Sequence, residues 1–173
     1  MMPLRSRKIT ICAIMTTAGL IMGYIETFVV IPVSIPGIRI GLANISTLIT
    51  LYLCGPLYAL FVHILRIFMS SLLFGNASTL IYSLCGGMLA FAVMVVLKRF
   101  EFGMYGVSVG GAVFHNLGQT AVAAILINNT FVFGYMPPLA LAGCVFGIIT
   151  GAVSNIVISR LKNMIRADSE GCL

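Results

Sequence analysis

The sequence predicts an all-α integral membrane protein, a six-helix transmembrane bundle, and three observations lead to this fold class. First, 60% of the 173 residues are hydrophobic and 8% are charged, which leaves too little polar surface to coat a soluble globule of this size. Second, the apolar residues fall into six segments. Third, the basic residues gather at the ends of these segments. Backbone polar groups inside lipid must be satisfied within each segment, so a bundle of helices is expected.

Most of the six segments reach the ~20 residues that a hydrocarbon core of about 30 Å requires. Short turns rich in Gly, Asn and Pro separate them at 54–56, 75–76 and 128–138. The second segment is long enough only if Arg39 and the two residues after it are included. Residues 31–40 hold two prolines and a glycine and predict an extended loop. The chain is therefore predicted to be one transmembrane domain, 1–173, with spans at about 9–30, 40–54, 56–74, 77–97, 104–127 and 137–159.

Lysine and arginine predict the orientation of the spans. An even number of crossings places three basic clusters on one side, which the positive-inside rule identifies as the cytoplasm. We therefore expect a multi-pass protein of the cell membrane with both termini cytoplasmic. A nucleic-acid partner is not expected, because these basic residues lie in short stretches beside the membrane. The clusters are Arg5, Arg7 and Lys8; Lys98 and Arg99; and Arg160, Lys162 and Arg166.

Small residues mark the expected helix contacts. Gly143, Gly147 and Gly151 share one face of the sixth span, and this spacing lets backbones approach closely. The pairs 106/110 and 19/23 repeat the spacing on the fifth and first spans, where packing inside the bundle is again the simplest explanation. On the first span a further small-residue stripe lies nearer the cytoplasm, and we expect it to dock a partner. It consists of Ala13, Thr17 and Ala18.

Polar residues inside the spans indicate where function lies. Arg66 falls near the middle of the third span, where a charge costs roughly 2.5–3.5 kcal/mol on insertion scales and usually faces protein or a water-filled cavity. His63 lies one turn away on the same face. In the fifth span, His115 and Gln119 share a face at i, i+4 spacing. The depths of these residues point to a cavity that opens outward and binds a small solute. The predicted substrate-binding residues are Arg66, His115, Asn116, Gln119, Asn44, Arg39 and Glu26.

Several of these residues have a structural explanation as well. Arg66 would form a structural ion pair with Glu26, the acidic residue placed in the outer half of the spans, or would contact the ligand. His115 would be a satisfied interhelical histidine or a ligand contact, whereas His63 would be structural. Arg39 would lie at the membrane interface or gate an anionic ligand.

Catalytic chemistry has little support in the sequence. The acidic residues are Glu26, Glu101, Asp168 and Glu170, so no aspartate pair can hold magnesium and diphosphate, and no nucleotide-binding or hydrolase motif occurs. The five cysteines are scattered without a metal-binding spacing. We expect no enzymatic activity, no cofactor and no metal. An ATP-driven process would need another subunit.

Four segments together closely resemble the Gx transporter family, whose members often carry the label heptaprenyl diphosphate synthase component I. They are PGIRIGLANISTLITLYLCGP at 36–56, LRIFMSSLLFG at 65–75, YSLCGG at 82–87 and HNLGQ at 115–119. The resemblance extends from Thr16 to Leu161. A catalytic meaning of the label conflicts with the missing aspartate-rich motifs.

This family is similar in turn to the S components of energy-coupling factor transporters, six-helix proteins that bind a micronutrient from outside. The resemblance implies a membrane transport component that binds a small solute and works with a coupling membrane subunit and ATPases. It implies that residues 31–40 gate the ligand and that Ala13, Thr17 and Ala18 contact the coupling subunit, although the usual AxxxA spacing is not intact. Other relatives point to an isoprenoid, quinone or flavin-related ligand. The alternative is a non-catalytic membrane subunit of a prenyl-quinone or flavin-linked electron-transfer system.

Overall fold

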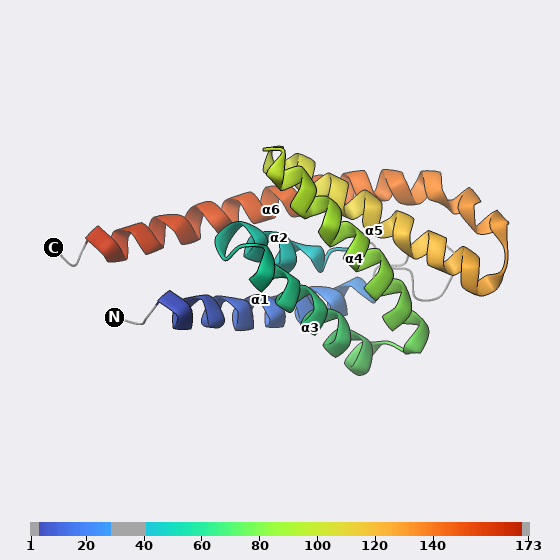
Figure 1. Cartoon of the computed structure of the whole chain (residues 1–173), viewed down its shortest axis with the longest axis horizontal. Coiled ribbons are helices and arrows are strands. Elements are labelled where there is room, and N and C mark those ends of the chain that lie inside the picture. The colour runs from blue at the N-terminus through green and yellow to red at the C-terminus, as the bar shows by residue number, and fades with distance from the viewer. Residues whose placement is uncertain (1–3, 29–40, 171–173) are drawn as a thin grey trace.

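The computed structural model describes residues 4–28 and 41–170, and side chains within 6–28 and 41–163. All regular secondary structure in the described residues is helical (Figure 1). The elements are α1 (Leu4–Glu26), α2 (Asn44–Leu53), α3 (Pro56–Phe74), α4 (Ala77–Arg99), α5 (Met104–Ile127), the 3-10 helix η1 (Thr130–Tyr135) and α6 (Met136–Glu170).

Five of these helices are long and apolar enough to cross a membrane, so the predicted all-α membrane fold is confirmed at that level. The bounds of α3 and α5 are those that the sequence predicts. The helix α6 continues well beyond the predicted end at 159, because polar residues outside lipid can prolong a helix. The segment predicted as a turn at 128–138 contains the extra helix η1.

The second predicted span, 40–54, differs most from the structure. Its helix, α2, has ten residues and therefore rises only ~15 Å, half of the hydrocarbon core. The chain enters α2 through Gly41, whose φ of 90° lies in the left-handed region, and a turn precedes the first helical residue. After α2, Gly55 has a φ of 97° and Pro56 opens α3. The predicted loop 31–40, the last residues of the first predicted span and Ile40 lie outside the described residues.

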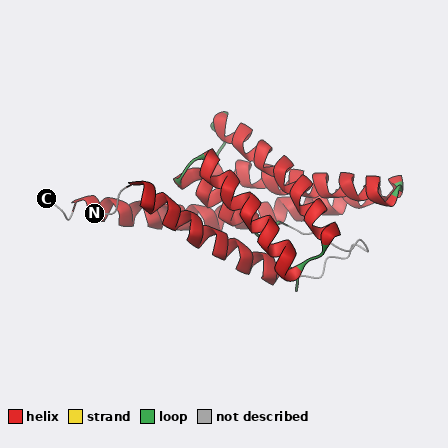
Figure 2. Ribbon diagram, turned by 60° about the horizontal axis from the view of Figure 1, so that its bottom comes forward, coloured by secondary structure: helices red, strands yellow, loops and turns green. Residues whose placement is uncertain are grey.

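The beginning of α1 and the end of α6 lie at the same end of the molecule, as both views show (Figures 1 and 2). We call this the terminal end. The turns that join α2 to α3 and α4 to α5 lie toward the terminal end, and the turns that follow α3 and α5 lie at the opposite, distal end (Figure 1). The described helices thus alternate in direction, as expected for successive membrane passes.

The short helix α2 lies at the centre of the bundle. It contacts each of the other five α-helices, and its residues are buried on nearly every side. Its last turn is stabilised from α4, because Lys98 Nζ donates to the carbonyl oxygen of Leu51 at 2.6 Å and lies over the ring of Tyr52. A cation is favourable at the C-terminal end of a helix, where the carbonyl groups are unsatisfied.

Glycine contacts hold the longer helices together. The most extensive pair is α4 with α5, followed by α5 with α6. On α6, Gly143, Gly147 and Gly151 are all buried against α5, which confirms packing for that ladder. On α5, Gly110 packs against α4, whereas Gly106 is exposed. On α1, Gly19 is buried against α2 and α3.

Gly118→Ala is expected to destabilise the protein. A Cβ at this position would lie 2.8 Å from the Cα of Gly86, so α4 and α5 would have to separate. Such overpacking costs about 1–3 kcal/mol, and each kcal/mol lowers the melting temperature by roughly 2–4 °C in a protein of this size. Thermal unfolding in detergent measures the shift. Gly103→Ala is the control, since a Cβ there meets nothing within 4 Å; equal melting temperatures for the two variants would contradict the packing.

Candidate functional site

A group of buried polar side chains lies around the beginning of α2. Each of these side chains is at most 7% exposed, although the helices that carry them are largely apolar. Arg66 lies ten residues after Pro56, which corresponds to ~15 Å of rise from the terminal end and places the group near mid-depth. We call this group the central polar cluster. It consists of Glu26, Asn44, Thr47, His63, Arg66, His115 and Gln119.

The third helix contributes the basic part of the cluster. His63 and Arg66 share one face of α3, and Arg66 Nη2 lies 3.3 Å from His63 Nδ1. A guanidinium only donates hydrogen bonds, so His63 Nδ1 accepts and the ring proton lies on Nε2. The ring of His63 is fully buried and stacks on Phe91 of α4. The prediction that His63 is structural agrees with this packing, yet its contact with Arg66 makes it part of the cluster.

The second helix supplies the polar groups that meet these two side chains. Asn44 and Thr47 are three residues apart and therefore face the same neighbour. Asn44 Oδ1 accepts from Arg66 Nη2 at 3.1 Å, and Thr47 Oγ1 lies 2.9 Å from His63 Nδ1. The side-chain nitrogen of Asn44, Nδ2, has no hydrogen-bond partner among the described residues. The first turn of α2 therefore presents a buried amide donor to the centre of the bundle.

Glu26 joins the distal end of α1 to Gly41, which lies three residues before α2. Its carboxylate accepts a hydrogen bond from the backbone N–H of Gly41 and is buried. The position of Gly41 is crowded, because a Cβ there would lie 3.0 Å from Asn44 Nδ2 and 3.2 Å from the ring of His115. Gly41 thus brings α1, α2 and α5 together at one point.

The other side of the cluster is formed by α4 and α5, and two glycines of α4 allow a close approach there. A Cβ on Gly86 would lie 2.7 Å from Gln119 Cγ and from the carbonyl oxygen of His115. A Cβ on Gly87 would lie 2.6 Å from His63 Nε2. The two glycines of α4 therefore let α5 and His63 approach the helix backbone directly. Gln119 faces this surface with its side chain, whereas His115 contributes its carbonyl oxygen and its ring lies beside Gly41.

Apolar residues enclose the cluster on both sides along the helices. Toward the terminal end, a hydrophobic core forms from Leu48, Leu51, Ala59, Phe91, Met94 and Val107. Toward the distal end, a smaller apolar cluster forms from Tyr82, Ala123, Ala124 and Val132. The polar side chains are therefore a separate layer between two apolar layers. On the terminal and the distal side of this layer, α4 and α5 pack through apolar side chains.

Asn116 lies apart from the central polar cluster. Its amide donates to the carbonyl oxygen of Leu139 on α6 at 2.7 Å, and it lines a cavity of about 270 Å³ between α5 and α6. The ring of its neighbour His115 lies instead beside Gly41, at the approach to α2. No other described residue among those predicted to contact the ligand lines this cavity. The side chain of Asn116 holds α5 to α6.

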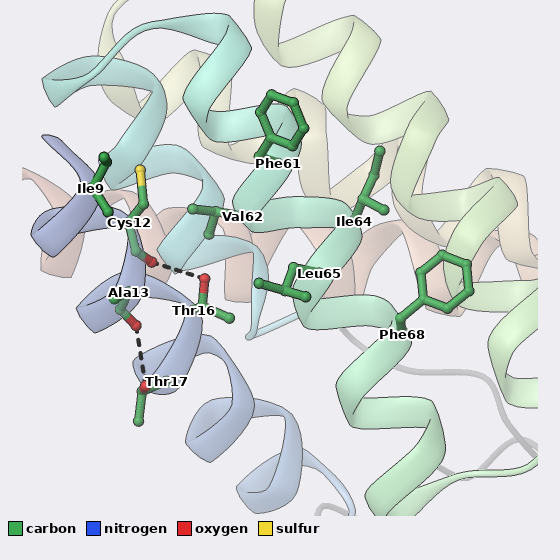
Figure 3. A pocket seen from close by; sticks show the side chains of 10 residues that line it. All are labelled: Ile9, Cys12, Ala13, Thr16, Thr17, Phe61, Val62, Ile64, Leu65 and Phe68. Atoms are coloured by element: carbon green, nitrogen blue, oxygen red, sulfur yellow. Dashed lines mark hydrogen bonds between the residues drawn. The ribbon is translucent and has the colours of Figure 1, made fainter. Parts of the chain in front are cut away.

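A groove with a volume of about 560 Å³ lies between α1 and α3 (Figure 3). Ala13 and Thr17 are exposed along α1, and Val62 and Leu65 project toward them from α3. The hydroxyls of Thr16 and Thr17 bond to carbonyl oxygens of their own helix, at 2.8 and 3.1 Å. The groove therefore presents an apolar surface. Ala18, the third residue predicted for docking, is half-buried and does not line it.

The structure brings together five of the seven residues predicted to bind solute: Glu26, Asn44, Arg66, His115 and Gln119. Asn116 faces α6, and Arg39 lies outside the described residues. The sequence analysis missed Thr47, Gly41 and the pair of glycines on α4. The spacing of Thr47 from Asn44 was a usable signal. Within the described residues no group of three or more His, Cys, Asp or Glu side chains is placed to hold a metal ion.

Comparison with known protein families gives a match over most of the chain. The family described as heptaprenyl diphosphate synthase component I matches residues 15–157, which is most of the chain and includes every member of the central polar cluster. No curated protein and no solved structure matches the chain. The chain belongs to the heptaprenyl diphosphate synthase component I family.

Proposed function

We propose that this protein is the solute-binding component of a membrane transporter and that its solute binds at the central polar cluster. The observation that carries the proposal is the buried layer of polar side chains around Arg66, near mid-depth in the bundle. Ionisable side chains at this depth are costly and commonly mark the path of a substrate or ion. The helices already pack through glycine and apolar contacts, so packing alone does not account for the layer.

The distribution of basic residues supports entry of the solute from outside. Lys8, Lys98 and Lys162 belong to basic clusters at the terminal end, which the positive-inside rule assigns to the cytoplasm. The distal end then faces outward, and a solute that reaches the first turn of α2 approaches from that side. On this proposal the protein lies in the cell membrane with both termini cytoplasmic.

Cysteine labelling is expected to distinguish the two ends. In a cysteine-free background, an impermeant thiol reagent should label Asn129→Cys in intact cells and leave Glu101→Cys unlabelled until the cells are opened. Both residues are exposed, Asn129 at the distal end and Glu101 at the terminal end. Labelling of both positions in intact cells would contradict the orientation.

Energy for transport would come from other subunits. The chain has four acidic residues and no nucleotide-binding motif, so the proposal includes a coupling membrane subunit and ATPases as partners. The groove between α1 and α3, with exposed Ala13 and Thr17, is the proposed docking surface, because small side chains let a partner helix approach closely. Membrane lipid would cover this groove in the isolated protein.

The family description favours a second function. Membership in the heptaprenyl diphosphate synthase component I family is consistent with a non-catalytic membrane subunit of a prenyl-quinone or flavin-linked system. In that case the ligand would be isoprenoid, quinone or flavin-related, or the polar layer would only hold the helices together. Neither function gives this chain a catalytic role, since its acidic residues do not provide paired carboxylates for magnesium and diphosphate.

Identification of the partners separates the two functions. The tagged protein is purified from its native membranes in mild detergent, and the bound proteins are identified and tested for ATP hydrolysis. We expect an ATP-hydrolysing assembly with one further membrane subunit. Recovery of a prenyltransferase or flavoprotein, with no ATPase, would replace the transport proposal with the second function.

A further inference from the structure

We propose that the solute carries an anionic group, a carboxylate or a phosphate, that binds at the N-terminal end of α2, and that Glu26 occupies the same place in the solute-free protein. The inference rests on the proposed function and specifies the class of solute for that site. It follows from three features of the described residues: the depth at which α2 begins, the donors gathered there and the carboxylate already bound to one of them.

The first feature is the position of the helix terminus. Because α2 rises only ~15 Å from the terminal end, its first turn lies near mid-depth and not at the membrane surface. The N-terminal end of a helix carries a partial positive charge. In α2 the first two N–H groups donate to the carbonyl oxygens of Gly41 and Leu42, so the helix dipole and the side chains of the first turn are what an anion would meet. Half-helices that begin inside a membrane protein present this end to anionic groups of substrates.

The second feature is a buried hydrogen-bond donor at that terminus, beside a guanidinium. Asn44 is 7% exposed, and its Nδ2 has no hydrogen-bond partner among the described residues. This nitrogen lies beside Gly41, since a Cβ on Gly41 would be 3.0 Å from it. The guanidinium of Arg66 lies against the same amide, with its Nη2 on Asn44 Oδ1. An amide and a guanidinium that converge in this way match the oxygens of a carboxylate or phosphate.

The third feature is the carboxylate of Glu26. It accepts the N–H of Gly41, three residues before α2, so the backbone that leads into this terminus already binds a carboxylate. Glu26 itself ends α1, where the helix dipole disfavours negative charge. On this proposal an incoming anion pairs with Asn44 and Arg66 and takes the Gly41 N–H from Glu26. The α1 dipole disfavours the Glu26 carboxylate, which makes Glu26 easier to displace. Displacement of Glu26 toward the distal end would open the site to the solute.

Asn44→Asp tests the charge of the solute directly. The new carboxylate keeps an acceptor for Arg66 and is favourable at a helix N-terminus, so the protein should fold. It also repels a second anion, and we expect affinity for phosphate or acetate to fall about a hundredfold or more. Equilibrium dialysis of the full-length, detergent-purified protein with radiolabelled phosphate, and separately with acetate, measures the affinity and shows which anion fits. The control is Asn76→Asp, because Asn76 caps α4 through an acceptor oxygen that aspartate retains.

Glu26→Gln tests the competition. Removal of the internal negative charge should tighten binding of the same probe about tenfold, while the amide oxygen can still accept from Gly41. Glu101→Gln, an exposed carboxylate at the terminal end, serves as control and should leave affinity unchanged. If Glu26→Gln does not fold, Asn44→Asp still decides the charge of the solute.

The outcomes separate this inference from the proposed function. Loss of the copurifying solute in both Arg66→Met and Asn44→Asp supports both proposals. If Arg66→Met loses the solute but Asn44→Asp retains it, the site exists and its solute is not anionic, which overturns the inference alone. If wild-type protein binds neither probe and Arg66→Met retains the copurifying solute, both proposals are wrong. Weaker or unchanged anion binding in Glu26→Gln would overturn the competition with Glu26.

Discussion

Arg66→Met is expected to abolish solute binding while the protein still inserts and folds. The substitution removes a charge that costs roughly 2.5–3.5 kcal/mol at the centre of a membrane helix. Methionine retains an unbranched apolar chain at the place where the aliphatic part of the Arg66 side chain packs against Gly19. Asn44 Oδ1 then loses a donor, at a cost of about 1–3 kcal/mol that offsets this gain. We therefore expect little net change in melting temperature and a loss of bound solute too large to measure.

The structural explanation of Arg66 predicts the opposite pattern. If Arg66 and Glu26 are a structural ion pair, each single change, Arg66→Met or Glu26→Gln, leaves a buried charge or polar group unpaired and lowers the melting temperature, and the double variant recovers it. Thermal unfolding of the wild type and the three variants in detergent, with solute content measured on the same samples, separates the two explanations. Destabilised single variants with recovery in the double variant would contradict a solute-binding role.

Ala13→Trp is expected to abolish transport and leave solute binding unchanged. Ala13 is exposed in the groove between α1 and α3, so a large side chain clashes with nothing inside the bundle (Figure 3). It fills the groove and keeps a partner helix from close approach, on which association in membranes depends. The central polar cluster does not include this residue. We therefore expect a normal melting temperature, normal solute content and no copurification with the coupling subunit.

A matched variant tests whether the effect belongs to the groove. Ile14 is also exposed on α1, one residue along the helix and therefore rotated away from the groove. Ile14→Trp should transport at the wild-type rate. Normal transport by Ala13→Trp, or an equal loss in both variants, would show that the groove does not dock the partner.

The membrane-spanning helices could be predicted because the local sequence determines where they begin and end. A long apolar run with glycine or proline at its ends determines α3 and α5 almost to the residue. The length of α2 could not be predicted in the same way. Its apolar run extends to residue 40, and the helix begins later because Gly41 adopts a positive φ and bonds to Glu26, a contact between residues fifteen positions apart.

The candidate site could be predicted in part for a similar reason. Charged and amide side chains such as Arg66, Asn44 and Gln119 stand out in an apolar sequence, since burial of these groups requires partners. Thr47 and the glycines of α4 do not stand out, because threonine and glycine are ordinary residues of membrane helices. Their role depends on which helix lies opposite, and only the packing of α2, α3 and α4 against one another reveals it.

Native mass spectrometry decides whether one solute binds at the cluster around Arg66. The wild-type protein and Arg66→Met are purified from the same membranes under the same conditions and sprayed as intact proteins. We expect one defined small molecule on each wild-type chain and none on Arg66→Met. A wild-type protein without a bound small molecule, or the same molecule at equal occupancy on Arg66→Met, would show that no solute binds at this cluster.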